Sequence, residues 1–181
     1  MFFALTIASE LIGIVILLLV IYFLGRPIIR GAIYFPTSPR SVEIMLRLAD
    51  VKAGDKLVDL GSGDGRILIA AAKAGAEAVG YEINPVLVRR SRRAIARAGV
   101  DAIDDAGKPG NAIVHWEDFW RVDFSPFDVV IVYGIPYIMK DLQNKLEREL
   151  RPGTKIISNA FTFPGWEPMA QERKIMLYIK K

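Results

Sequence analysis

A glycine-rich turn between a strand and a helix constrains the fold of this chain more than any other feature. Residues 56–60 (KLVDL) have the composition of a buried strand, the turn GSGDG (61–65) follows, and residues 66–74 have helical composition. Further strands are predicted at 78–82, 112–115, 128–133, 155–158 and 175–179, and further helices at 38–49, 84–98 and 137–150. This alternation is typical of an α/β fold with a doubly wound, mostly parallel sheet covered by helices on both faces. The last two strands lack room for a crossover helix, so we expect them to pair antiparallel.

The turn 61–65 lies at the carboxyl end of a predicted strand, where open α/β sheets bind their ligands. Glycines let the backbone approach a ligand closely, and the following helix offers free N–H groups. A dinucleotide site requires G-x-G-x-x-G, but Arg66 stands where the third glycine should fall. A P-loop is excluded because no Gly-Lys-Ser/Thr follows.

Two acidic residues flank this turn. Asp59 stands just before it, where a carboxylate would repel a pyrophosphate but can accept hydrogen bonds from the cationic amino-acid end of S-adenosylmethionine. Glu82 ends the next strand, where an acidic side chain accepts from ribose hydroxyls. The plain alternative is a strand–turn–helix unit with a surface glutamate. The agreement of both acids with Gly61, Gly63 and Gly65 favours a site for S-adenosylmethionine.

The N-terminal residues 2–24 are apolar enough for a membrane span. A helix of this length rises roughly 34 Å, which exceeds a hydrocarbon core of about 30 Å. Glu10 interrupts the segment, but residues 11–24 carry no strongly polar side chain. A signal peptide is disfavoured because no Lys or Arg precedes the segment, and a buried core helix is disfavoured because the segment is apolar all round. We expect a transmembrane anchor over residues 1–25.

The rest of the chain is predicted to comprise a juxtamembrane connector (26–37) and a single catalytic domain (38–181). Arg26, Arg30 and Arg40 follow the predicted span and no basic residue precedes it. The positive-inside rule then predicts a single-pass protein with its catalytic domain on the cytoplasmic side of the membrane.

Several motifs resemble the class I, seven-β-strand methyltransferases that use S-adenosylmethionine: DLGSGDGR (59–66), AVGYEINP (78–85) and EDFW (117–120). Others resemble one branch more narrowly: YFPTSPR (34–40), VIVYGIP (130–136), KLERELRPGTKIIS (145–158) and FTFPGWEP (161–168). That branch comprises small membrane-associated protein-lysine methyltransferases related to those acting on the c-subunit of ATP synthase and on adenine nucleotide translocase. The resemblance implies a seven-stranded Rossmann-like sheet, S-adenosyl-L-methionine as cofactor, and a protein lysine as acceptor, possibly in a membrane protein.

The resemblance also implies roles for individual residues. The methionine part of the cofactor would be cradled by Asp59 and by the turn residues Gly61, Ser62, Gly63 and Gly65. Glu82 would hold the ribose. Asp118 would accept from the adenine amino group with Phe119 packing near the ring, although a loop cap is the ordinary alternative for Asp118.

An attacking lysine must be uncharged, and its ordinary pKa is about 10.4. Desolvation in an apolar slot would lower that pKa. Candidates for the slot come from the end of the fourth strand and the loop before the last strand: Tyr133, Pro136, Phe161, Phe163 and Trp166. The hydroxyl of Tyr133 is the candidate for orienting the amine, and no general base is evident. Phe161 and Phe163 are equally consistent with core positions.

Composition excludes other kinds of site. The chain has no cysteine and a single histidine, His115, so disulfides, thiolate metal sites and multi-histidine metal centres are excluded. Five arginines share the helix after Glu82: Arg89, Arg90, Arg92, Arg93 and Arg97. A solvated face is the ordinary interpretation, and a patch facing anionic lipid is the sharper one. Nucleic acid is disfavoured because no aromatic residues interleave with the arginines.

Two other functions remain compatible with the sequence. One is methylation of a small molecule or a lipid, which a membrane anchor would also suit. The other is a catalytically silent module that binds S-adenosylmethionine within a membrane assembly. Intact Asp59 and Glu82 argue against the silent module.

Overall fold

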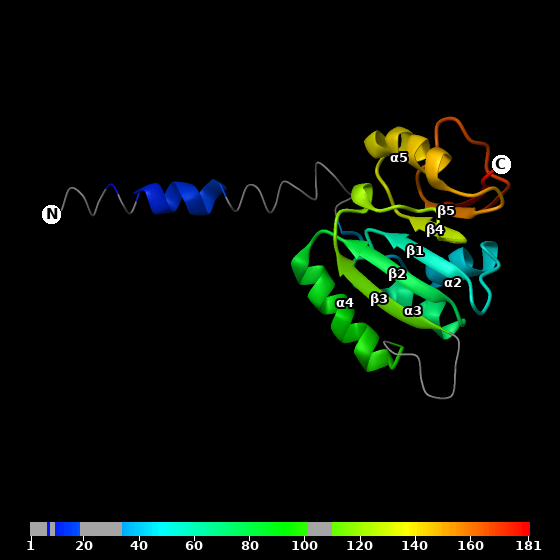
Figure 1. Ribbon diagram of the computed structural model, residues 1–181, viewed down its shortest axis with the longest axis horizontal. Coiled ribbons are helices and arrows are strands. Elements are labelled where there is room, and N and C mark those ends of the chain that lie inside the picture. The colour runs from blue at the N-terminus through cyan, green and yellow to red at the C-terminus, as the bar shows by residue number, and fades with distance from the viewer. Residues whose placement is uncertain (1–6, 8–9, 19–33, 101–109) are drawn as a thin grey trace.

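The computed structural model describes residues 7, 10–18, 34–100 and 110–181. Within these residues one seven-stranded sheet has the order β3-β2-β1-β4-β5-β7-β6 (Figure 1). The strands are β1 (Lys56–Leu60), β2 (Glu77–Glu82), β3 (Asn111–Trp116), β4 (Val129–Val132), β5 (Lys155–Asn159), β6 (Ala170–Glu172) and β7 (Ile175–Ile179). The helices are α2 (Pro39–Leu48), α3 (Arg66–Lys73), α4 (Pro85–Ala98) and α5 (Pro136–Glu149), with a 3-10 turn η1 (Phe119–Arg121).

The sheet is mixed. Strands β3, β2, β1, β4 and β5 run parallel, whereas β7 pairs antiparallel with both β5 and β6. The α/β fold, its parallel part and the antiparallel pairing of β5 with β7 confirm the sequence prediction. Strand β6 was not predicted from the residues, because three residues are too few to show an alternating pattern.

Helices cover the two faces of the sheet unequally. Helices α2, α3 and α4 pack on one face, and α5 packs on the other (Figure 1). The segment after β3 helps α5 to cover that second face through the buried side chains of Phe119, Phe124 and Phe127. All four residues of β4 are buried, as expected for a central parallel strand.

Helices α2 and α4 begin where the sequence provides side-chain caps. The side chain of Ser38 accepts from the backbone N–H of Ser41 at the start of α2. The side chain of Asn84 accepts from the N–H of Val86 and Leu87 at the start of α4. Proline follows each cap, which is its favoured place in a helix. These caps fix α4 directly after Glu82 and therefore place it beside the predicted cofactor site.

Most of the predicted N-terminal anchor lies outside the described residues, namely 1–6, 8–9 and 19–25, as do residues 26–33 of the connector. Residues 10–18 are helical, and their large apolar side chains are 53–60% exposed. Among the described residues, no helix combines the length and apolarity needed to cross a bilayer.

Candidate functional site

A cavity of about 520 Å³ opens at the carboxyl ends of β1, β2 and β4. Its volume lies within the range typical of ligand sites. Strand β1 leads into α3 on one face of the sheet, whereas β4 leads into α5 on the other. The cavity therefore lies at the topological switch point, where open α/β sheets bind ligands.

The turn after β1 is held against β2 by its own backbone. The N–H groups of Gly61 and Ser62 donate to the carbonyl of Tyr81 at 2.9 and 3.1 Å. Gly61 has a positive φ of 81°, and no heavy atom lies within 4 Å of the position that a Cβ would take. The hydroxyl of Ser62 is buried without a hydrogen-bond partner among the described residues. The turn thus offers uncovered backbone and an unused polar group at the wall of the cavity.

The last glycine of the turn, Gly65, does not lie at the cavity, although its position in the motif implies a place beside the ligand. It instead caps α3 with a φ of 80°. A Cβ at Gly65 would lie 2.2 Å from the hydroxyl of Ser91 in α4. This glycine therefore permits the close packing of α3 against α4, and its predicted contact with the cofactor remains a prediction.

The two acidic residues are buried at the inner wall of the cavity. Glu82 accepts a hydrogen bond from the N–H of Gly63 at 3.0 Å on one carboxyl oxygen and from the N–H of Asn84 at 2.8 Å on the other. Burial raises the pKa of Glu82, and these backbone hydrogen bonds oppose the rise. Burial, followed by the charges of Glu82 and Asp64, raises the pKa of Asp59 to about 8. Clustered carboxyls are therefore costly to ionise in the cofactor-free chain, and a bound cation would offset that cost.

The end of the connector forms one wall of the cavity, which the sequence pattern alone did not indicate. The ring of Tyr34 covers Gly63, and Tyr34 hydrogen-bonds to Asp64. Arg66 forms two hydrogen bonds with Asp64 and a third with the carbonyl of Thr37 at 2.6 Å. The hydrogen bond from Arg66 lowers the pKa of Asp64. The signal was present in YFPTSPR (34–40), because that segment carries part of the family resemblance.

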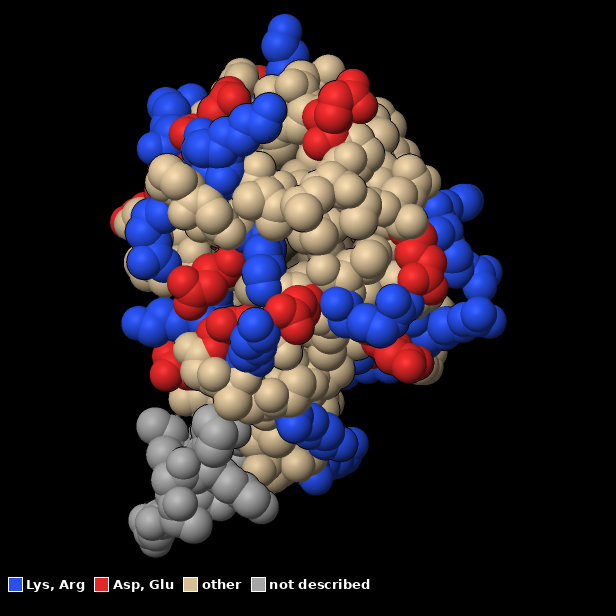
Figure 2. All heavy atoms as spheres, turned by 90° about the vertical axis from the view of Figure 1, so that its right-hand side faces the viewer, with Lys and Arg blue, Asp and Glu red and all other residues tan. Residues whose placement is uncertain are grey.

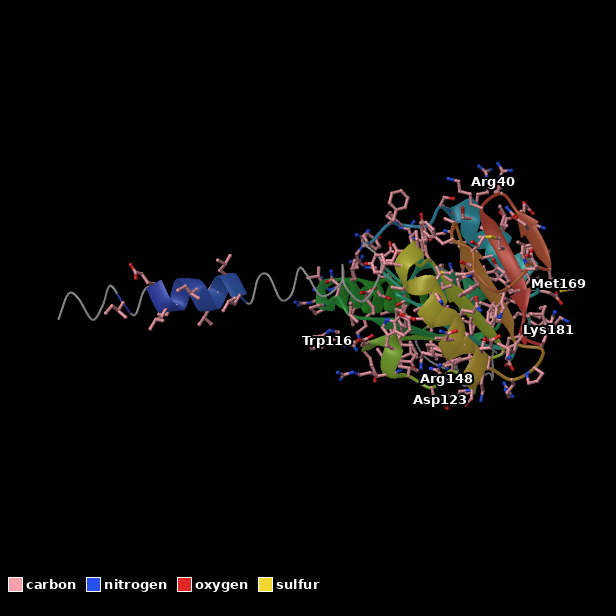
Figure 3. All side chains as sticks on the ribbon, turned by 90° about the horizontal axis from the view of Figure 1, so that it is seen from above. Arg40, Trp116, Asp123, Arg148, Met169 and Lys181 are labelled. Atoms are coloured by element: carbon pink, nitrogen blue, oxygen red, sulfur yellow. The ribbon has the colours of Figure 1, made fainter. Side chains whose placement is uncertain are left out.

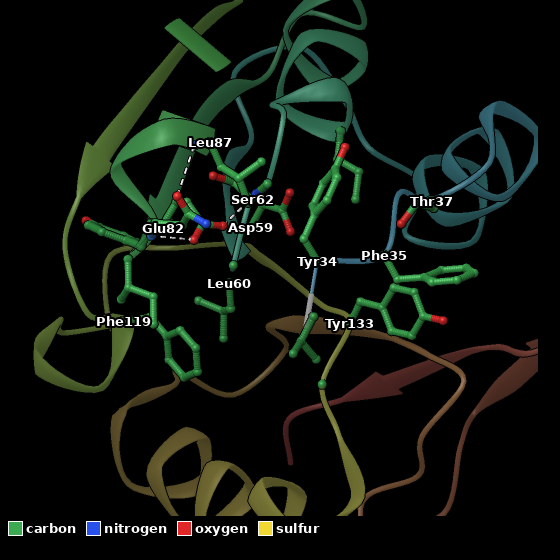
Figure 4. Close-up of a pocket in the computed structure, with 18 of the residues that line it drawn as sticks. Tyr34, Phe35, Thr37, Asp59, Leu60, Ser62, Glu82, Leu87, Phe119 and Tyr133 are labelled. Atoms are coloured by element: carbon green, nitrogen blue, oxygen red, sulfur yellow. Dashed lines mark hydrogen bonds between the residues drawn. The ribbon is translucent and has the colours of Figure 1, made fainter. Parts of the chain in front are cut away.

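The other end of the cavity is aromatic. Figure 4 shows Glu82 and Phe119 on one side of the cavity and Phe35 and Tyr133 on the other, with Asp59 between them. The ring of Tyr133 lies edge-on to Phe35, with centroids 6.2 Å apart, and 6.4 Å from the centroid of Phe161. Tyr133, Phe161 and Phe119 all line the cavity.

The backbone after β5 is strained where it presents Phe161. Ala160 adopts a positive φ of 72°, which is uncommon for a residue other than glycine. The N–H of Ala160 donates to the carbonyl of Lys174, and the hydroxyl of Ser158 donates to the carbonyl of Phe161. These bonds hold Phe161 at the cavity, and strain of this kind gathers at functional sites.

Three residues predicted for the aromatic slot lie elsewhere. Phe163 is 1% exposed and packs against Trp166 and Tyr178, with centroids 5.0 and 5.2 Å apart. The indole N–H of Trp166 donates to Glu147 on α5. Pro136 is the first residue of α5, whereas its neighbours Ile135 and Tyr137 line the cavity. The placement of Phe163, Trp166 and Pro136 in the slot is therefore corrected: the loop before β7 folds back onto α5, and only its beginning reaches the cavity.

Asp118 caps the 3-10 turn η1, where its side chain accepts from the N–H of Trp120 at 3.2 Å. It does not line the cavity, although the next residue, Phe119, does and is 7% exposed. The proposed contact between Asp118 and an adenine ring remains a prediction.

Comparison with known proteins places the chain in a family. Residues 59–170 match the family described as the ANTKMT methyltransferase domain. The ATP synthase C-subunit lysine N-methyltransferase of Mus musculus is 41% identical over 157 residues, which span 83% of this chain and 60% of that protein. A protein-lysine N-methyltransferase of Saccharolobus islandicus is 40% identical over 137 residues, which span 75% of this chain and 80% of that protein.

A solved structure has the same fold. It is described as an RNA methyltransferase from Salinibacter ruber in complex with S-adenosyl-L-homocysteine. The TM-score is 0.70 at 37% identity, and the match covers 81% of this chain and 92% of that one. That structure contains the demethylated form of the cofactor that the motifs predict for this chain.

Proposed function

The chain belongs to the ANTKMT methyltransferase family, and from that premise we propose that it transfers a methyl group from S-adenosylmethionine to lysine side chains of acceptor proteins. One observation carries the proposal: a single cavity joins a buried acidic end to an aromatic end. The acidic end suits a cationic nucleoside, and the aromatic end suits an uncharged amine.

The acidic end fits S-adenosylmethionine in three respects. Asp59 is a buried carboxyl beside Glu82 and Asp64, and its pKa of about 8 keeps it protonated at neutral pH in the cofactor-free chain. The ammonium of the cofactor's amino-acid part would stabilise the Asp59 carboxylate and lower that pKa. Gly61 offers uncovered backbone at the wall of the cavity, because no heavy atom lies within 4 Å of the position that its Cβ would take. The Glu82 carboxylate accepts backbone hydrogen bonds on both oxygens, and its two oxygens together have about four acceptor positions, so it can also accept from ribose hydroxyls.

When bound, S-adenosylmethionine supplies a methyl group activated by its sulfonium. The chain supplies position and exclusion of water. An acceptor lysine that enters between Phe35, Tyr133 and Phe161 leaves its hydration shell, which lowers its pKa and favours the neutral amine. The Tyr133 hydroxyl gives this aromatic end a polar group, which we assign to orienting the amine nitrogen.

Membrane attachment is part of the proposal. The apolar sequence of residues 2–24 is long enough for one span, and the helical residues 10–18 expose their apolar side chains. The arginines that follow the segment favour a catalytic domain on the cytoplasmic side. Extraction of membranes at alkaline pH tests this part: the chain is expected in the membrane pellet, and release into the supernatant would contradict the anchor.

RNA is the second candidate acceptor, because the relative from Salinibacter ruber is described as an RNA methyltransferase. We favour lysine because the described acceptors of the relatives from Mus musculus and Saccharolobus islandicus are proteins.

The decisive experiment incubates the purified full chain in detergent with labelled S-adenosylmethionine and a detergent extract of membranes. We expect release of S-adenosylhomocysteine, and mass spectrometry should find methylated lysines in extract proteins. Label only in the RNA or lipid fraction would overturn the lysine proposal, and no product in any fraction would leave a silent binding module.

A matched pair of variants on β2 controls this assay. Glu82→Gln replaces the buried acid at the cavity, whereas Glu77→Gln replaces an exposed acid at the other end of the same strand. The proposal requires Glu82→Gln to lose methylation and Glu77→Gln to retain it.

A further inference from the structure

We propose that the rim of the cavity is a membrane-docking surface that rests on the headgroups of an anionic bilayer. The rim consists of four large apolar side chains that the fold leaves exposed: Phe35 (71%), Val86 (72%), Trp116 (62%) and Tyr137 (59%). This inference rests on the membrane attachment that is part of the proposed function, but it concerns a surface around the site and does not require lysine methylation.

The four residues come from four separate segments, and each either lines the cavity or is hydrogen-bonded to a residue that lines it. Phe35 and Tyr137 themselves line the cavity. The N–H of Val86 donates to the side chain of Asn84, and the indole N–H of Trp116 donates to the carbonyl of Ile83. Both acceptors also line the cavity. Figure 3 accordingly shows Trp116 at the end of the domain opposite Met169 and Lys181.

Basic side chains lead away from the rim along α4, which begins at the cavity and ends beside the start of β3. Residues 86, 89, 90, 93 and 97 recur at helical spacing, so Val86 shares its exposed face with four arginines. Helix α4 contains no acidic residue, and within the described residues Arg89, Arg93 and Arg97 form no ion pair. The exposed acidic side chain that follows Trp116 is Glu117, so the positive charges outnumber it.

The opposite end of the domain looks different. The cavity lies at the end of the domain to which the arrowheads of β1, β2 and β3 point in Figure 1. Figure 2 shows the opposite end, where basic and acidic side chains are interleaved. Exposed apolar side chains, with Arg89 near the start of α4, therefore distinguish the end that carries the cavity. Tyrosine and tryptophan are enriched at membrane interfaces, and each basic residue near an anionic surface adds about 1 kcal/mol of attraction.

The length of chain before the rim favours a bilayer as the occupant. Nine residues, 25–33, separate the apolar segment from Tyr34, which lies in the cavity wall. Even fully extended, this connection spans roughly 30–35 Å. A domain tied so closely to a membrane by the connector meets the bilayer first with the end at which the connector enters.

The absence of cysteine makes a direct test possible. Single cysteines are introduced as Val86→Cys or Trp116→Cys at the rim and as Met169→Cys, a control that is 74% exposed at the opposite end. Each full-length variant is labelled with an environment-sensitive fluorophore and reconstituted into vesicles of phosphatidylcholine with or without phosphatidylglycerol. We expect a blue shift of emission at both rim sites in the anionic vesicles and none at Met169.

Neutralising the arginines tests the charge argument. The pair Arg89→Gln/Arg93→Gln should shift the balance between docked and undocked rim by roughly 30-fold toward undocked, because two basic residues contribute about 2 kcal/mol. Arg148→Gln/Lys181→Gln, away from the rim, should leave the blue shift at Val86 unchanged. Rim labels that stay as water-exposed as the Met169 label in anionic vesicles would overturn the proposal. So would a blue shift that appears only when RNA or an acceptor protein is added. Neither result depends on methyl transfer.

Discussion

Substitution of Gly65 by alanine should destabilise the domain through two separable effects. At a φ of 80° a Cβ costs about 1–2 kcal/mol of backbone strain. The same Cβ would lie 2.2 Å from the hydroxyl of Ser91. If the hydroxyl rotates away, the Ser91 Cβ at 3.2 Å is still tight, and the fully buried serine has little room to move. Overpacking of this kind costs about 1–3 kcal/mol, so we expect a total loss of about 2–5 kcal/mol.

Gly54 provides the matched control for the strain. Its φ is 85°, and no heavy atom lies within 4 Å of the added Cβ, so Gly54→Ala should cost only the strain of about 1–2 kcal/mol. The difference between the two variants isolates the steric contact with Ser91. Adding Ser91→Ala to Gly65→Ala should restore part of that difference, since the closest clashing atom is then absent.

The assay is denaturant unfolding of the cofactor-free full chain in detergent, followed by circular dichroism. Thermal unfolding should show the same order, because 1 kcal/mol shifts the midpoint by about 2–4 °C for a chain of this size. Equal destabilisation by Gly65→Ala and Gly54→Ala would refute the argument that α3 and α4 pack through this glycine. If Gly65→Ala lowered cofactor affinity without lowering stability, Gly65 would instead be assigned to cofactor binding.

Three further predictions concern the cavity itself. The pKa of Asp59 is raised to about 8 in the folded chain, whereas an unfolded aspartate titrates near 3.9. As the pH rises, the unfolded state therefore loses this proton before the folded state does. The free energy of unfolding consequently falls between about pH 4 and pH 8. The stability advantage of Asp59→Asn in the cofactor-free chain should grow across that window, and a constant difference would contradict the assignment. Tyr133→Phe should lower turnover while calorimetry shows unchanged cofactor affinity; equal loss of both would place Tyr133 in cofactor binding instead. Phe35→Ala should raise KM for the acceptor without changing the unfolding midpoint, because this ring is 71% exposed and contacts Tyr133, and an unchanged KM would remove it from the acceptor path.

The fold could be predicted from the sequence because its signals are local. Each signal depends on residues that are neighbours in the chain: the strand pattern of 56–60, the glycine turn, and the helix starts at which a capping side chain is followed by proline. The predicted bounds of β1 and β7 agree with the structure residue for residue. Strand β6 could not be predicted from the sequence, because its three residues form a strand by pairing with β7, which is a tertiary contact.

The cofactor end of the site was predicted better than the acceptor end for the same reason. Asp59 and Glu82 end adjacent strands, so the parallel sheet alone brings them together. The aromatic residues of 161–166 lie in an irregular loop, and their periodicity does not reveal which side chain faces the cavity and which enters the core. Phe161 faces the cavity, whereas Phe163 is buried against Tyr178.

The connector shows why a boundary drawn from sequence patterns can divide a site. The predicted catalytic domain starts at residue 38, because Ser38 is a recognisable helix cap. The ring of Tyr34 nevertheless covers Gly63, and Arg66 is held by the carbonyl of Thr37. For the cavity, the functional unit therefore begins at Tyr34. The segment that would tether the domain to a membrane is also a wall of its site, so the distance between acceptor and bilayer is limited by the same residues that close the cofactor end.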